Sequence, residues 1–120
     1  MILKAAKGTR TYWDIPGGRI DDTETIEQTL HRELSEELPD LKTYSIGNVL
    51  GVHRLERDLS DGNGLILVFY KVNAESFEVN LSDEHTEYIW VDQKNVSELL
   101  NPETPIEMGY CNAIVSALNE

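Results

Sequence analysis

Three glutamates within five positions are the residues of this 120-residue chain best suited to chemistry. Glu33, Glu36 and Glu37 stand at i, i+3 and i+4, so on a helix their carboxylates share one face. Like charges at this spacing destabilise a helix by about 0.2–0.5 kcal/mol per pair, a repulsion that a divalent cation would offset. Carboxylate oxygens suit Mg²⁺ or Mn²⁺, and Mg²⁺ usually shares its coordination shell with water and substrate phosphates.

The alternative interpretation is a solvated acidic face, which is the usual explanation for such a run in an acidic protein. The neighbouring residues favour a built site. Gly17–Gly18 precede the glutamates, Glu24 lies between, and Arg32 directly precedes Glu33. Arg32 also stands four residues before Glu36, which is the weaker orientation for helix stabilisation. The arginine is therefore better explained as a residue that holds a carboxylate in position.

A helix from about Thr25 to Leu38 is expected to carry the glutamates. Apolar residues recur every four positions from Ile26 to Leu38, and Thr25 and Gln28 have the spacing of a capping box. Pro39 lacks the N–H group that would continue the helix. The glutamates are thus predicted to lie on a helix with defined ends.

Strands and two further helices are expected around this helix. The β-rich runs 44–54 and 65–73 flank a polar connection that ends in Asp-Gly-Asn-Gly, which predicts a hairpin. Short strands are expected at 2–4, 12–15 and 87–92, and helices at 93–100 and 106–119. This mixture is typical of an α+β or a layered α/β/α domain.

The composition favours a single soluble domain that spans residues 1–120. Lys and Arg total 10 against 22 Asp and Glu, a formal charge of -12, which argues against nucleic-acid polymers and anionic membranes as partners. The longest apolar run, 65–70, is far shorter than a membrane span, and the N-terminus does not resemble a signal peptide. We therefore expect a cytoplasmic protein, whose lone Cys111 has a packing role.

Three segments resemble motifs of the Nudix hydrolases. Gly18, Glu24 and Arg32–Glu37 resemble the signature G-x5-E-x7-R-E-U-x-E-E-x-G-U, in which U is aliphatic. Residues 13–18 resemble the W-x-x-P-G-G lead-in, and residues 83–90 resemble the later E-H-x-E-y-x-W segment. Two features depart from the family: Pro39-Asp40 replaces the closing Gly-aliphatic pair, and the strand that usually comes first is missing.

This resemblance implies a fold and a reaction. The fold is α/β, a Nudix-like α/β/α sandwich with a mixed sheet that lacks the usual first strand. The reaction is Mg²⁺-dependent hydrolysis, with Mn²⁺ as a substitute, of a diphosphate bond in a nucleoside diphosphate linked to another group. Water would attack phosphorus. The substrate would be a small nucleotide whose binding residues are not indicated, and the missing strand favours a homodimer.

The resemblance also assigns roles to individual residues. Four residues are expected to hold the metal, Glu36 directly or through water: Glu33, Glu36, Glu37 and the carbonyl of Gly17. Three are expected to support them: Arg32 by orienting a carboxylate, Glu24 by bracing the loop, and Gly18 within that loop. The catalytic base is either a helix glutamate, Glu33, or an acidic residue of a later loop, with Glu84 ahead of Glu87.

Other interpretations remain beside this one. A catalytically silent Nudix-like module that binds a nucleotide or a protein is motivated by the two departures and opposed by the retained glutamates. An acidic interaction module without a metal is a third hypothesis. Trp13 and Trp90 are expected to fill the core rather than stack on a base. His53 and His85 are expected to be surface or hydrogen-bonded structural residues.

Overall fold

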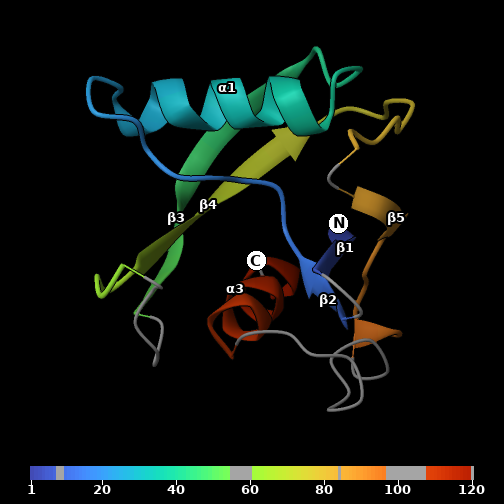
Figure 1. The fold of residues 1–120 in the computed structure, drawn as a ribbon. Helices are drawn as coiled ribbons and strands as arrows, with labels where there is room; N and C mark the ends of the chain where they lie inside the picture. The colour runs from blue at the N-terminus through green and yellow to red at the C-terminus, as the bar shows by residue number, and fades with distance from the viewer. Residues whose placement is uncertain (8–9, 55–60, 84, 97–107, 120) are drawn as a thin grey trace.

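The computed structural model describes residues 1–7, 10–54, 61–83, 85–96 and 108–119 (Figure 1). It contains the following elements in chain order: β1 (Ile2–Lys7), β2 (Arg10–Asp14), α1 (Ile26–Glu37), β3 (Tyr44–Arg54), β4 (Ile66–Ala74), β5 (His85–Ile89) and α3 (Met108–Leu118). The predicted glutamate helix and the predicted long hairpin are both confirmed.

Helix α1 begins at a complete capping box. The Thr25 hydroxyl accepts a hydrogen bond from the Gln28 N–H at 3.1 Å, and the Gln28 side chain accepts one from the Thr25 N–H at 2.9 Å. Both donors would otherwise lack a partner within the helix. The last helical residue is Glu37, two positions before Pro39. The local signals in the sequence therefore set both ends of the helix.

The strands form two antiparallel sheets. One has three strands in the order β2-β1-β5, and the other is the β3-β4 hairpin. All pairings among the described residues are antiparallel, so the predicted mixed sheet is not observed there. A mixed sheet needs a parallel pair, which requires a long crossover connection, whereas β3 and β4 follow one another directly as a hairpin. The broader prediction of an α/β fold agrees with the elements present.

The two helices contact opposite faces of the hairpin. Leu34, Leu38 and Leu41 form the buried cluster that joins α1 to Val72 of β4. On the other side, Tyr110 of α3 contacts Phe69 of β4 edge to face, with ring centroids 5.5 Å apart. Phe69 and Val72 are three positions apart on one strand, so their side chains point to opposite faces. This layering is compatible with the predicted sandwich.

Three expectations about the later part of the chain need correction. The strand predicted at 87–92 runs from His85 to Ile89, and Trp90, expected in the core, is 56% exposed beyond its end. Of the helix predicted at 93–100, residues 93–95 form a turn, whereas Val96 is helical and donates its N–H to the Asp92 carbonyl at 3.0 Å. Residues 97–100 lie outside the described residues. The terminal helix is described over Met108–Leu118 and ends one residue before its predicted end, whereas 106–107 lie outside the described residues. Among the described helices, none combines the length and the apolar character needed to span a membrane.

Candidate functional site

The site is built around the turn between β2 and α1. In Figure 1 this segment leaves β2 and runs back across the molecule to the start of α1. The Gly17 N–H donates a hydrogen bond to Glu37 Oε2 at 2.7 Å, and Gly17 has a φ of +154°, a conformation that favours glycine. A Cβ atom on Gly18 would lie 2.1 Å from Glu33 Oε1. The two glycines therefore let the backbone lie directly against two helix carboxylates.

Arg32 connects the start of α1 to Glu33. Its Nε and Nη2 donate to the two oxygens of Glu24 at 2.8 and 3.0 Å, a bidentate contact. Its Nη1 donates to Glu33 Oε1 at 2.8 Å, and its Nη2 also donates to the Arg19 carbonyl at 3.0 Å. One guanidinium thus contacts the turn, the segment before the helix and a carboxylate of the predicted metal site.

Glu24 is held by several donors. Besides Arg32, the Thr29 hydroxyl donates to Glu24 Oε1 at 3.1 Å and the Asp21 N–H donates to it at 3.2 Å. The hydrogen bond from Arg32 is the largest cause that lowers the pKa of Glu24 to about 2, against the opposing effect of desolvation. The same contact raises the pKa of Arg32 above its ordinary value. Glu24 is therefore ionised throughout the neutral range and braces the turn as a carboxylate.

The three predicted metal-binding glutamates do not all face the turn. Glu37 is 3% exposed and the Glu33 side chain is 13% exposed, and both lie against the glycines. Glu36 instead has a side chain that is 60% exposed, with Oε2 3.6 Å from Arg32 Nη1. Within the described ranges, no three His, Cys, Asp or Glu side chains converge as a ready metal-binding group.

The donor set at the turn nevertheless fits a hard divalent cation. Glu33 and Glu37 supply carboxylate oxygens beside the partly buried Gly17 and the exposed Gly18. Mg²⁺ typically binds one or two carboxylates and completes its shell with water and substrate phosphates, so a third converging protein ligand is not required. Because Gly18 has no side chain, the Glu33 carboxylate can lie close to the backbone at this position.

Among the predicted base candidates, Glu33 lies against the Gly18 backbone. Glu84 is outside the described residues, so its role stays a prediction. Glu87 is exposed on β5, a strand that pairs with β1. Neither residue is brought to the Gly17 turn by a described contact.

Two contacts at or near the site were not predicted from the sequence. Thr29 is buried, and its hydroxyl binds Glu24. A β-branched hydroxyl residue within the helix was the available signal. Asp14 and His85, whose Nε2 lies 3.7 Å from Asp14 Oδ2, come together from β2 and β5. Nothing local in the sequence indicates that contact.

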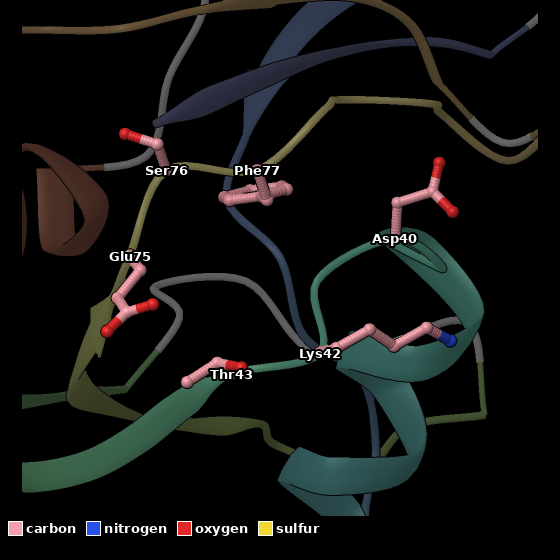
Figure 2. A pocket seen from close by; sticks show the side chains of 6 residues that line it. All are labelled: Asp40, Lys42, Thr43, Glu75, Ser76 and Phe77. Atoms are coloured by element: carbon pink, nitrogen blue, oxygen red, sulfur yellow. The ribbon is translucent and has the colours of Figure 1, made fainter.

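A pocket of about 150 Å³ lies beyond the C-terminal end of α1. It is lined by Asp40, Lys42, Thr43, Glu75, Ser76 and Phe77. Figure 2 shows Asp40 and Glu75 on opposite sides of this pocket with Phe77 between them, so its charged groups do not converge. None of its lining residues belongs to the predicted site.

Comparison with known proteins identifies the family. A stretch of 27 residues, 22% of this chain, is 56% identical to the 8-oxo-dGTP diphosphatase of Proteus vulgaris, of which it covers 24%. The match thus spans about a quarter of that relative's length. The model of the Nudix domain family matches residues 2–108 of this chain. Since this match covers most of the chain, including the turn, α1 and the five described strands, the chain belongs to the Nudix family.

Proposed function

We propose that this protein hydrolyses a diphosphate bond in a nucleoside diphosphate derivative with the help of Mg²⁺ or Mn²⁺. Membership in the Nudix family supports hydrolysis as the reaction class. The observation that carries the proposal is the contact of Glu33 and Glu37 with the Gly17–Gly18 turn. Two carboxylates on one helix, held against the backbone of two glycines, form a preorganised set of oxygen donors.

Each residue of the site has a distinct task in this proposal. Glu33, Glu37 and the Gly17 carbonyl would hold the cation, and Glu36 would act through water because its side chain points to solvent. The bound cation would neutralise phosphate charge and lower the pKa of a water molecule. Arg32 fixes the orientation of Glu33, and Glu24 in turn fixes Arg32.

The net charge of the chain supports a role for the cation. With 10 basic and 22 acidic side chains, the protein repels a free polyphosphate at neutral pH. The substrate therefore has to arrive with its charge neutralised, as a metal complex. We propose a small nucleotide rather than a nucleic-acid polymer, for which the described surface offers few cations.

The relative suggests which nucleotide to test first. Its name describes hydrolysis of 8-oxo-dGTP, and the shared stretch is 56% identical. We propose that purine nucleoside triphosphates, including oxidised dGTP, come first in a substrate panel, followed by nucleotide sugars, dinucleotides and coenzymes. The product nucleotide reveals which diphosphate bond is cut.

The test compares Glu37→Gln with wild type and with a matched variant, Glu27→Gln. Both residues lie on α1, but the Glu27 side chain is 76% exposed, with Oε1 3.5 Å from His31 Nε2. We expect Glu37→Gln to lower kcat/KM by at least about 100-fold, because a metal ligand is lost, and Glu27→Gln to change it less than about twofold. Equal rates for all three proteins across the panel would contradict the proposal.

A further inference from the structure

His85 is a buried histidine outside the predicted metal site. It is the first residue of β5, and its side chain is only 3% exposed. Its Nε2 lies 3.7 Å from Asp14 Oδ2, and its Nδ1 has no hydrogen-bond partner in the part of the chain that the structure describes. Burying a polar ring is costly without a polar partner. The carboxylate of Asp14 is the partner that faces it.

Asp14 links this histidine to the turn. It is the last residue of β2, and its Oδ1 accepts a hydrogen bond from the Ile15 N–H at 2.8 Å. One carboxylate oxygen therefore holds the backbone as it leaves the strand, and the other faces His85. Two residues beyond Ile15, the Gly17 N–H donates to Glu37. The path from His85 to the helix carboxylate thus passes through Asp14 and a short backbone segment.

The sheet register explains why these two distant residues meet. Strand β1 lies between β2 and β5, with Leu3 opposite Asp14 and Ala5 opposite His85. Positions 3 and 5 are two apart along β1, so their partners Asp14 and His85 lie on the same face of the sheet. An irregularity in the β1-β5 pairing falls between Lys4 and Ala5, next to the His85 position. Bulges of this kind re-aim a side chain.

We propose that His85 is a positioning residue that holds Asp14, and through Asp14 holds the Gly17 turn against α1. The consequence for metal binding rests on the proposed function. His85 acts at a distance from the reacting atoms, by restricting the backbone that carries Gly17 and faces Glu37. Because β5 directly follows residue 84, the same contact ties the strand after the predicted base to the turn.

The test uses two polar substitutions that differ in reach. The glutamine amide nitrogen in His85→Gln extends to the position of Nε2, whereas the asparagine amide in His85→Asn extends only to that of Nδ1. His53→Asn, at a half-buried histidine of β3, is the matched control. The readouts are the ¹H–¹⁵N shift of the Gly17 amide without metal and the Kd for Mn²⁺ by electron paramagnetic resonance.

We expect His85→Gln and His53→Asn to keep the wild-type Gly17 amide shift and a Mn²⁺ Kd within about threefold. We expect His85→Asn to move the Gly17 amide and weaken Mn²⁺ binding about 10- to 100-fold, the range typical for residues that orient metal ligands. A moved Gly17 amide in His85→Asn, combined with no Mn²⁺ binding by wild type, would support the positioning role and contradict the proposed function.

Two results would overturn the inference. One is a His85→Asn protein that matches wild type in both readouts. The other is equal loss in His85→Gln and His85→Asn, including failure of both to fold in a thermal melt, since that pattern assigns His85 to packing alone.

Discussion

At the scale of single residues, two glycines that lie against two carboxylates define the candidate site. Gly17 has a φ of +154° and donates its N–H to Glu37, and Gly18 lies so close to Glu33 that a Cβ there would require the Glu33 carboxylate to move. These restrictions come from different causes, backbone conformation for the first and close approach for the second. Both keep oxygen donors of α1 close to the turn.

The substitution Gly18→Ala tests the close approach. The added Cβ would lie 2.1 Å from Glu33 Oε1, so the carboxylate or the turn has to move. We expect Mn²⁺ affinity and kcat/KM each to fall by about tenfold or more. Gly51→Ala is the control, because a Cβ at Gly51 meets nothing within 4 Å. Wild-type Mn²⁺ affinity in Gly18→Ala would show that Glu33 does not need this position.

A second prediction concerns the pH dependence of stability through Glu24. The Arg32 contact lowers the pKa of Glu24 from 4.5 to about 2. A carboxylate whose pKa is lower in the folded than in the unfolded protein stabilises the fold at pH values above its unfolded-state pKa. This contribution is lost as the pH falls from about 4.5 toward 2. We therefore expect Glu24→Gln to lower the Tm at pH 7 and to approach the wild-type Tm toward pH 2.

The control for this prediction is Glu78→Gln, at an exposed residue. The Tm difference between Glu78→Gln and wild type should be small and should not change between pH 4.5 and pH 2. A Tm difference between Glu24→Gln and wild type that is constant from pH 7 to pH 2 would argue against the Arg32 contact as its cause.

At the scale of the elements, local sequence signals predicted the bounds of α1, whereas bounds that depend on distant strand partners were not predicted. Thr25, Gln28 and Pro39 act on their own backbone neighbours, so the bounds of α1 could be predicted within a residue. Strand β5 begins and ends earlier than its β-rich residues suggested, because its pairing with β1 decides where it begins and ends. The same dependence on distant partners explains why the exposure of Trp90 was not foreseen.

The capping box offers a test at this scale. Thr25→Ala removes the acceptor for the Gln28 N–H, and we expect the free energy of unfolding to fall by about 1 kcal/mol in urea titrations. Thr23→Ala, two positions earlier in an exposed turn, should change it by less than about 0.5 kcal/mol. Equal losses of unfolding free energy in the two variants would show that the Thr25 cap does not stabilise α1.

At the scale of the whole molecule, the site and the core share α1. Glu33 and Glu37 face the turn, whereas Leu34 and Leu38 of the same helix segment are buried in the cluster with Leu41. Most of the candidate site comes from one continuous stretch, 17–37, which is why its parts could be predicted from spacing alone. The contact of Asp14 with His85 joins two strands that are far apart in the chain, and no sequence pattern predicted it.

This shared helix leads to a prediction about the core. Leu38 is 3% exposed, and we expect Leu38→Ala to lower the free energy of unfolding by about 2–5 kcal/mol. Val52→Ala, at a position that is 66% exposed, should cost much less. Calorimetric melts measure both. A Leu38→Ala protein as stable as Val52→Ala would show that this cluster does not hold α1 to the strands.

The most direct measurement is a crystal structure of the protein grown with Mg²⁺ and a non-hydrolysable nucleoside triphosphate. The account predicts a cation bound by Glu33, Glu37 and the Gly17 carbonyl, with the analogue's phosphates completing its shell. Cation and phosphates bound elsewhere, with Glu33 and Glu37 apart and away from both, would contradict it.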